Sequence, residues 1–516
     1  MLLLKIPRLP RGFVVLKWLR ISISLSFVLF GQILSPPTMA TTWDVPSQCP
    51  TIQAGIDSAS AGDTVLVACG TYLEHDIVMK SSICVRSETG EPECVTIDAQ
   101  DLGRVITCID IDNTTFVKGV TITGGHARGD SVDGFGGGMY CCGSSPTLLH
   151  CRFSENQADL NGGGMYLHQC SHPILTDVAF VGNTGKSGGG AACSGDAEPE
   201  FVNVRFSDCH AALEGGGLHC HWGPTPVLSG CSFIDNSAGM GAGARCVDAS
   251  ANFDECEFSG NIASGGGGVY ATWGSCRFTN CVCSVNTAGV GGGFFLADGH
   301  PLVRNVSFLH NEANLGGGLA CTFNIPTIDE CLFSQNRAVV RGGAVLAETH
   351  SSPQFAGCVF VGNTASSGGA ADCVSNTSPT FTNCTFAGNS GDGAAVHSTL
   401  NSHATVDQTI IAFTPFGGRA VSCDDGSSVN LSCCDVFGNV SGDWVDCIED
   451  QYGINGNISE DPLFCDPDNG DYHLDCTSPC APGYNPECGL IGAWGVGCGA
   501  TRTEQTTWSS LKALYR

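Results

Sequence analysis

Positive charge is what this chain has least of. Lys and Arg together number 22 against 50 Asp and Glu, and charged residues make up only 14% of the 516 positions. Eight of the basic residues lie in residues 1–40 and 499–516, so residues 41–498 carry 14 Lys and Arg against 49 acidic residues, a net charge near −35. A body this acidic repels phosphate backbones and anionic lipid surfaces. The composition therefore argues against nucleic acid or an anionic membrane as a partner.

Amphipathic helical patterns and long apolar runs are also scarce. No helical pattern of ten or more residues separates the predicted strands, which excludes helical repeats and the strand–helix leucine-rich type, and a propeller blade needs about 40 residues. The one long apolar run covers residues 21–34, and these 14 residues are short for a bilayer. We therefore expect no membrane-spanning segment in the mature chain.

The apolar run belongs to a segment with the pattern of an export signal. Five basic residues precede it, namely Lys5, Arg8, Arg11, Lys17 and Arg20. Thr38, Met39 and Ala40 offer a cleavage site. We predict that residues 1–40 are a signal peptide, with a transmembrane anchor as the alternative. Because all 32 cysteines follow residue 48, we expect an oxidising location, secreted to the extracellular space or held in the cell envelope.

Glycine, by contrast, is abundant, and many of the 70 glycines belong to one repeated unit. Each copy passes from a Pro through Cys-x-Phe to an Asn and then to a glycine run, as in residues 352–370. The third copy has Cys209 in the Asn slot, and the other copies align at Asn156, Asn183, Asn236, Asn261, Asn286, Asn311, Asn336, Asn363 and Asn389. The period is about 26 residues, the length class of solenoids.

The constant half of each copy has the pattern of a short strand. Apolar residues two apart flank a polar one, as in Cys256-Glu257-Phe258, which is the alternation of a strand buried on one face. Asn tolerates left-handed backbone and ends the strand, and stacked Asn amides are expected to hydrogen-bond along the array. Glycine runs allow close backbone approach. We predict an all-β fold, a parallel β-helix with one coil per repeat and ladders of Phe and Cys inside.

The repeat divides the mature chain into four regions. Residues 41–135 are expected to form an N-terminal cap and the first coils, with a short helix over residues 51–60 that covers the open edge before the first strand. Residues 136–400 form the regular coils. Residues 401–498 hold the last coils and a Cys-rich cap, and residues 499–516 are a basic, aromatic tail.

The cysteines fall into two groups. Those of the repeat are expected to be small buried hydrophobes, with disulfides within a coil as the alternative; they are Cys151, Cys193, Cys220, Cys231, Cys246, Cys256, Cys281, Cys321, Cys331, Cys358, Cys373 and Cys384. Those of the caps are irregularly spaced and are expected to form disulfides; they include Cys49, Cys69, Cys84, Cys94, Cys465, Cys476, Cys480, Cys488 and Cys498.

Short motifs flank the array. TIQAGID at 51–57, GDTV at 62–65 and GTYLE at 70–74 precede it, and DPLF at 461–464, GDYHL at 470–474, SP at 478–479 and IGA at 491–493 follow it. With the repeats, they resemble the bacterial secreted right-handed parallel β-helix proteins of the pectin-lyase-like superfamily. The Phe-x-x-Asn and Gly-Gly-Ala repeats are also similar to those of the chlamydial polymorphic outer-membrane proteins, which are surface adhesins.

The resemblance implies a right-handed β-helix that acts either as a binding protein or as a polysaccharide lyase or glycosidase. The tripartite Asp constellation of polygalacturonases and the Arg and Asp calcium arrangement of pectate lyases are not recognisable in this sequence. Fold analogy alone does not separate the two classes of function. We prefer a non-catalytic surface for glycan or cell-surface binding, and we assign no catalytic residue.

One row of the variable half has the chemistry of a glycan site. Five residues past each glycine run, aromatic and acidic residues alternate on successive coils, at Trp222, Asp248, Trp273, Asp298 and Phe323. Next-but-one coils lie about 10 Å apart, close to two sugar units, and aromatic faces beside carboxylates suit a polysaccharide. Coincidence on five solvated loops is the alternative. Asp248 and Asp298 nearly have the separation of a general acid and base, but nothing in the sequence indicates a raised pKa or a partner.

Two further groups have metal-ligand chemistry without a metal-binding spacing. They are the histidines His168, His172, His219 and His221, and the acidic residues Asp466, Asp468 and Asp471 of the closing segment. The first group is read as surface histidines and the second as a polar turn. We therefore predict no metal and no cofactor, with Ca²⁺ on the acidic group as the alternative.

The tail offers a last candidate. Trp508, Leu511 and Leu514 lie at helical spacing beside Lys512 and Arg516. We interpret residues 500–516 as a short signal for docking on sorting machinery, with a frayed terminus as the alternative.

Overall fold

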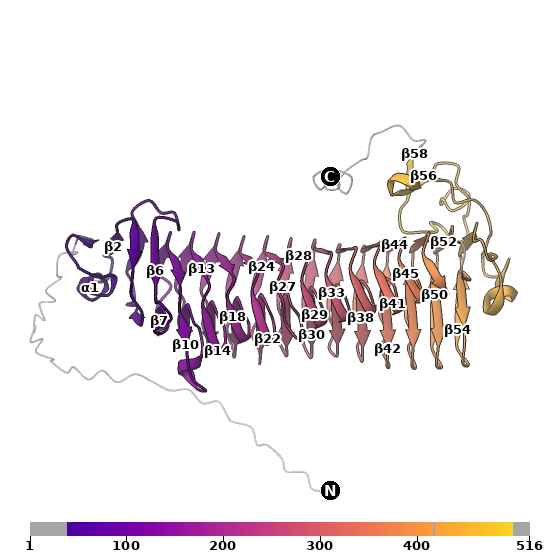
Figure 1. Cartoon of the computed structure of the whole chain (residues 1–516). Coiled ribbons are helices and arrows are strands. Elements are labelled where there is room, and N and C mark those ends of the chain that lie inside the picture. Colours follow the sequence, from indigo (N-terminus) through magenta and orange to yellow (C-terminus); the bar gives the residue numbers. More distant parts are fainter. Residues whose placement is uncertain (1–38, 416–417, 499–516) are drawn as a thin grey trace, which may run out of the picture. The chain divides into compact units, whose positions relative to one another are not determined.

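The computed structural model describes residues 39–415 and 418–498, so the predicted signal peptide up to residue 38 and the predicted sorting tail lie outside the described residues. Within the described part, strands of successive coils pair in parallel and form three long sheets of 16, 15 and 14 strands (Figure 1). The predicted parallel β-helix is confirmed. No helix in these two ranges is long and apolar enough to cross a membrane.

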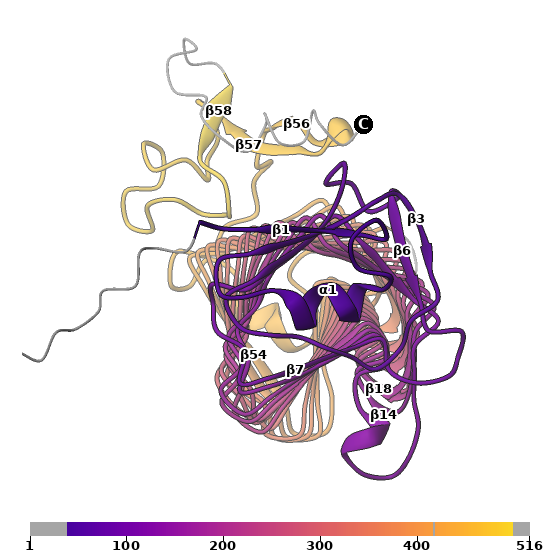
Figure 2. The ribbon, with the colours of Figure 1, turned by 90° about the vertical axis from the view of Figure 1, so that its left-hand side faces the viewer.

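One coil shows how the repeat folds. The copy at residues 352–374 contains four strands, β43 (Gln354–Ala356), β44 (Val359–Val361), β45 (Thr364–Ser367) and β46 (Ala371–Val374). They belong, in that order, to the 16-stranded, the 15-stranded, a six-stranded and the 14-stranded sheet. Viewed end-on, the coils lie one behind the other (Figure 2). The repeat of the sequence is therefore one turn of the solenoid.

The long sheets differ in where they begin and end. The 16-stranded sheet runs from β1 (Thr42–Val45) to β54 (Ser428–Ser432). The 15-stranded sheet runs from β3 (Gly70–Tyr72) to β55 (Asp435–Phe437). The 14-stranded sheet runs from β4 (Ile77–Val78) to β53 (Val421–Cys423). Two shorter sheets share a fourth side, from β10 (His126–Ala127) to β22 (His210–Glu214) and from β29 (Ile262–Gly265) to β49 (Ser390–Asp392). Single bridges at Ser237 and Met240 connect these two.

Stacked phenylalanines fill the core, as predicted. In the 15-stranded sheet the rings of Phe206, Phe233 and Phe258 lie parallel, with centroids 4.9 and 4.8 Å apart. Cys283 takes the next place, and the column resumes at Phe308. All these side chains are fully buried. The inward residues of the Cys-x-Phe pattern therefore form one continuous apolar core along the coils.

The repeat asparagines form a hydrogen-bonded row at one corner. The side-chain amide of Asn261 donates to Oδ1 of Asn286 at 2.9 Å, and the backbone N–H of Asn261 donates to the same oxygen at 3.0 Å. The same pattern joins the asparagines from Asn236 to Asn389. Cys209 interrupts the row, because its thiol cannot accept in the same way, yet its backbone N–H still donates to Asn236 Oδ1. Each amide thereby satisfies buried backbone groups of the preceding coil, as Asn261 does by accepting from the N–H of Asn236 and donating to the carbonyl of Phe233.

The cysteine predictions hold for the repeat and only partly for the caps. The repeat cysteines are buried and unbridged. Within the described residues the structure has four disulfides, at Cys69–Cys94, Cys423–Cys447, Cys433–Cys488 and Cys465–Cys498. The remaining cap cysteines for which disulfides were expected are unbridged, namely Cys49, Cys84, Cys476 and Cys480. The burial of Cys49 in the core against the capping helix, and the contact of Cys480 with Asp435, explain two of these exceptions.

The capping helix is confirmed, with one change in its place along the chain. Helix α1 (Ile52–Ser58) begins at Thr51, whose side chain accepts from the N–H of Ala54, and it buries Ile52 and Ile56. It lies across the open end of the first coil (Figure 2). Strand β1 precedes it and pairs with β2 (Thr64–Val67), whereas the sequence indicated a helix before the first strand.

The Cys-rich closing segment covers the end of the core and packs against one side of the coils. The short helix η2 (Asp446–Gln451) buries Ile448 at the end of the core. The following residues form a separate sheet, β56 (Phe464–Asp466), β57 (Asp471–Asp475) and β58 (Val496–Cys498). Tyr472 packs on the outer side of β44 and β48 (Thr385–Ala387), and Asn383 donates to the carbonyl of Leu490. The segment thus covers one flank of the coils as well as their end.

Candidate functional site

The 14-stranded sheet presents a row of polar side chains on its outer face. In β23 (Leu218–His221), Leu218 and Cys220 point into the core, so His219 and His221 point outward. In the next coils, Arg245 of β26 (Ala244–Val247) and Tyr270 of β30 (Val269–Thr272) take the place of His219 in register. Strand alternation therefore brings a histidine, an arginine and a tyrosine side by side on three successive coils.

A glycine corner turns this face into a groove. Residues 215–217 are glycines, of which Gly215 has a φ of +64°, and a Cβ on Gly216 would lie 2.6 Å from the carbonyl oxygen of Ala242. Only glycine allows so sharp and close a corner. The turn sets Glu214, the last residue of β22, against the outward side chains of β23. The concave space has a volume of about 670 Å³.

The lining residues come from six coils. They are Asn161, Glu214, His219, His221, Trp222, Met240, Arg245, Val247, Tyr270, Thr272, Trp273, Ala297, Asp298 and Thr322.

Contacts among the floor residues hold them in place. Glu214 lies 3.2 Å from Nε2 of His219 through Oε2, and 3.7 Å from Nε of Arg245 through Oε1. The Arg245 guanidinium lies over the Tyr270 ring at 4.0 Å, a cation–π contact, and its Nη1 donates to the carbonyl of Cys246 at 3.1 Å. The rings of His219 and His221 stack with centroids 4.7 Å apart. The floor is therefore a preformed polar surface.

Four polar atoms of this floor make no hydrogen bond within the protein. His219 and Arg245 are each 5% exposed and His221 is 7% exposed, yet both ring nitrogens of His219, Nδ1 of His221 and Nε of Arg245 make no hydrogen bond, although Glu214 lies near His219 Nε2 and Arg245 Nε. Buried polar atoms are almost always paired, and leaving one unpaired costs about 1–3 kcal/mol. Such atoms side by side in a groove mark the positions at which a ligand or water would bind.

The charges of the floor nearly cancel. Burial, with the neighbouring His219, lowers the pKa of His221 to about 4, so this imidazole is neutral at neutral pH. Contact with His219 lowers the pKa of the Glu214 carboxyl, which is therefore ionised. Burial also lowers the pKa of Arg245, though from so high a value that the guanidinium remains charged. One negative and one positive group face each other across the corner.

The predicted glycan row forms one rim of this groove. Each of its five residues has a positive φ, and the backbone N–H of each donates to a backbone carbonyl of the next coil. The five residues therefore occupy equivalent places on successive coils; they are Trp222, Asp248, Trp273, Asp298 and Phe323. Trp222 and Trp273 are 71% and 64% exposed. Both tryptophans and Asp298 line the groove, whereas Asp248 and Phe323 stand in the same row outside its lining.

The structure separates the histidine candidates. His219 and His221 form the floor, while His168 lies two coils away and its Nδ1 contacts the Ser194 hydroxyl at 2.9 Å. His172 is exposed and lies 3.8 Å from Glu198. Among residues 39–415 and 418–498, no group of three or more His, Cys, Asp or Glu is arranged to hold a metal ion.

The acidic candidates of the closing segment serve the local backbone. Asp466 accepts from the Asn469 amide at 2.8 Å across the turn η3 (Pro467–Asn469), and Asp471 accepts from the His473 ring at 2.7 Å. Asp468 lies within the same turn. These contacts explain the residues as parts of a tight connection between β56 and β57.

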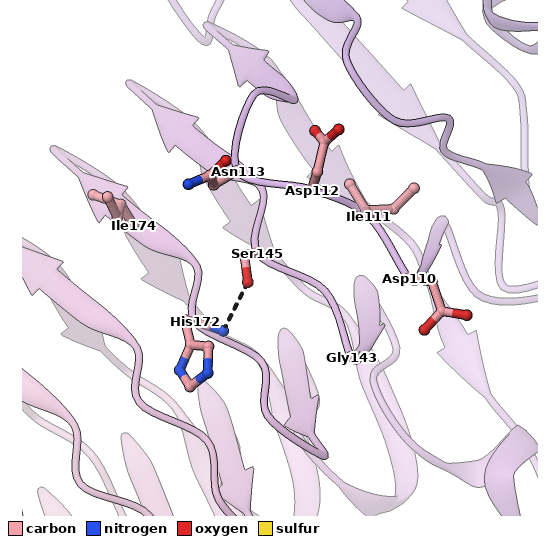
Figure 3. A pocket seen from close by; sticks show the side chains of 8 residues that line it. All are labelled: Asp110, Ile111, Asp112, Asn113, Gly143, Ser145, His172 and Ile174. Atoms are coloured by element: carbon pink, nitrogen blue, oxygen red, sulfur yellow. Dashed lines mark hydrogen bonds between the residues drawn. The ribbon is translucent and has the colours of Figure 1, made fainter. Parts of the chain in front are cut away.

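A second hollow, of about 450 Å³, lies near Asp112 and His172. In Figure 3 the side chains of Asp110, Asp112 and His172 point in different directions. Hydrogen bonds from Ser82, Thr114 and Thr115 lower the pKa of Asp112 to about 2. The Ser145 hydroxyl accepts from the backbone N–H of His172. Its polar groups are thus already used to hold turns, and they do not converge on a ligand position.

Further along the same outer face, His397 of β50 (Val396–Thr399) lies between two carboxylates. Its Nδ1 is 2.9 Å from Asp372 and its Nε2 is 3.4 Å from Asp424. Burial lowers the pKa of His397, but the hydrogen bonds and charges of Asp372 and Asp424 together outweigh burial and raise it. Arg419 bridges Asp392 and another carboxylate nearby. These charges pair mainly with one another and tie the last coils together.

Of the residues whose contacts build the floor of the groove, the sequence did not predict Glu214, Arg245 and Tyr270. A signal for two of them was present, because counting two residues past the last glycine of each run gives the outward row that contains His219, Arg245 and Tyr270. Glu214 precedes its glycine run, and only the fold of the corner brings it against that row.

Comparison with models of protein families supports the fold. The family model described as a right handed beta helix region matches residues 137–252 and 238–378, which are regular coils. Among solved structures, a PL6 alginate lyase in complex with a trisaccharide is 10% identical, with a TM-score of 0.38, over 71% of this chain and 85% of the other. The pectate lyase Pel9A is 11% identical, with a TM-score of 0.24, over 89% and 96%. Neither likeness carries an argument about function.

No curated protein matches the sequence.

Proposed function

We propose that this right-handed β-helix protein is exported and binds a glycan in the groove beside Trp222 and Trp273, without cleaving it. The observation that carries the proposal is the pair of exposed indole rings on next-but-one coils, about 10 Å apart by the spacing of parallel strands, above a floor of buried polar atoms that make no hydrogen bond within the protein. Indole faces pack on sugar rings, and the floor atoms suit their hydroxyls.

A binding role fits the acid–base chemistry of the groove better than catalysis does. General acid catalysis by a carboxyl group at neutral pH needs a raised pKa. The pKa of Glu214 is lowered, and this carboxylate is engaged with His219 and Arg245. The four disulfides of the described residues favour an oxidising location, in keeping with export to the extracellular space or the cell envelope.

Replacing both tryptophans tests the proposal. We expect Trp222→Ala/Trp273→Ala to weaken retention on a binding polysaccharide at least tenfold in affinity gel electrophoresis, because two stacking faces are lost, and each factor of ten corresponds to about 1.4 kcal/mol. Tyr484→Ala is the matched control, since this ring is 59% exposed and lies in the closing segment away from the groove.

Two outcomes would contradict the proposal. Equal retention of the double variant and the wild type on every polysaccharide bound would remove the groove from binding. Release of reducing ends or of unsaturated products by the wild type would show that the chain is a glycosidase or a lyase.

A further inference from the structure

We infer that the groove selects a neutral polysaccharide and discriminates against polymers of uronic acids. This inference rests on the proposed function and adds the chemical class of the ligand. It follows from the balance of charge in and around the groove, from the contacts of its single arginine and from the hydrogen-bonding character of the floor atoms that make no hydrogen bond within the protein.

The charge balance is unfavourable for a polyanion. Arg245 is the only Lys or Arg among the residues that line the groove, and Glu214 lies beside it. On the rim, Asp298 lines the groove and Asp248 stands between the two tryptophans in the same row, and neither has an ion-pair partner within 4 Å among the described residues. The groove and its rim therefore carry a net negative charge, within a body near −35. Like charges across an interface disfavour binding.

Arg245 is not set to receive a carboxylate. Its side chain is almost fully buried, its charge is offset by Glu214, its Nη1 donates to the carbonyl of Cys246 and its guanidinium lies flat on the Tyr270 ring. Recognition of a carboxylate by arginine uses two parallel N–H donors that face the ligand. Within this groove the guanidinium acts as a fixed part of the floor.

The unpartnered atoms match hydroxyl groups. A neutral imidazole can donate from one ring nitrogen or accept at the other, depending on the tautomer, and a sugar hydroxyl can do both. Nδ1 of His219 and Nδ1 of His221 belong to adjacent stacked rings, and Nε of Arg245 is a donor on the next coil. The three atoms could meet hydroxyls of neighbouring sugar rings without any charge on the ligand.

The test compares polymers of similar length that differ in charge. The probes are neutral β-glucan, glucomannan and galactan against polygalacturonate and alginate, each cast into affinity gels at low and high NaCl. We expect at least tenfold stronger retention on one or more neutral polymers, with little effect of salt, because the contacts are hydrogen bonds and ring stacking.

A variant that removes the carboxylates of the rim tests whether the charge at the groove sets the preference. Asp248→Asn/Asp298→Asn should raise the retention on the uronate polymers severalfold relative to the retention on the neutral polymer, because it removes two negative charges from the rim. Asp208→Asn/Asp235→Asn is the control, because these exposed aspartates also have positive φ but lie at another corner of successive coils. Asn tolerates that backbone, so both variants should fold, which circular dichroism checks.

The outcomes distinguish a failure of the inferred preference for neutral polymers from a failure of the proposed glycan binding. Stronger, tryptophan-dependent retention on a uronate polymer would overturn the inference and leave the groove as a glycan site. Equal gains in the two charge variants would show that net charge, and not the rim, sets the preference, and would also overturn it. Binding to none of the five polymers would overturn the proposed function itself for these classes of glycan.

Discussion

Replacing Phe233 by alanine is expected to lower the free energy of unfolding by about 3–5 kcal/mol, the range for truncating a fully buried phenylalanine. Both faces of this ring are covered, by Phe206 at 4.9 Å and Phe258 at 4.8 Å between centroids, and Phe253 meets its edge. Removing the ring leaves a cavity between three coils. Because each coil contacts only its neighbours, the loss weakens two coil–coil interfaces at once.

The measurement is denaturant unfolding followed by circular dichroism, with Trp222→Ala as the control. Trp222 is larger than Phe233 but mostly exposed, so its removal is expected to change stability by no more than about 0.5 kcal/mol. A loss below 1 kcal/mol for Phe233→Ala would contradict a continuous phenylalanine column inside the coils.

The second large effect concerns Asp435 and has a defined pH dependence. Its carboxyl group is fully buried, and burial raises its pKa to about 7. The folded state therefore binds a proton more tightly than the unfolded chain, whose aspartate titrates near 3.9, so the free energy of unfolding falls as the pH rises from about 4 to 7. At 1.36 kcal/mol for each pKa unit, the free energy of unfolding is lower above pH 7 than at pH 4 by up to about 4 kcal/mol.

Asp435→Asn removes this titration and keeps an oxygen that can accept from the N–H of Glu460, as Asp435 does at 3.0 Å. We expect the variant to be more stable than the wild type at pH 8 by about 1–4 kcal/mol, and nearly equal to it at pH 4. Denaturant unfolding at both pH values measures the difference, with the exposed Asp208→Asn as the control. A variant no more stable than the wild type at pH 8 would contradict a buried, destabilising carboxylate.

Much of the fold could be predicted because each repeat of the sequence corresponds to one coil of the structure. Residues that must stack in register, such as Phe233 and Phe258, recur at a fixed offset from Asn236 and Asn261, and their period of two identifies the buried face. The disulfide partners could not be found in this way. Cys423 and Cys447 meet where a coil of irregular length ends, so their sequence spacing carries no regular signal.

The groove was predictable only in part, for a physical reason. Trp222 and Trp273 repeat at one place in the coil, and counting from the glycines finds them. Glu214 belongs to the strand before the corner, and its contact with His219 depends on how sharply the glycines turn. The burial of Arg245 on the outer face of a sheet likewise follows from the concave corner, which alternation alone does not reveal.

The central claim is that a glycan lies along the rim formed by Trp222 and Trp273, and hydroxyl-radical footprinting with mass spectrometry tests it most directly. Both indoles are mostly exposed and should be labelled readily in the free protein, as should the exposed Tyr484, which serves as an internal control. With a bound polysaccharide at saturation, we predict at least threefold slower labelling of Trp222 and Trp273 and unchanged labelling of Tyr484. Full labelling of both tryptophans in the bound state would contradict the claim.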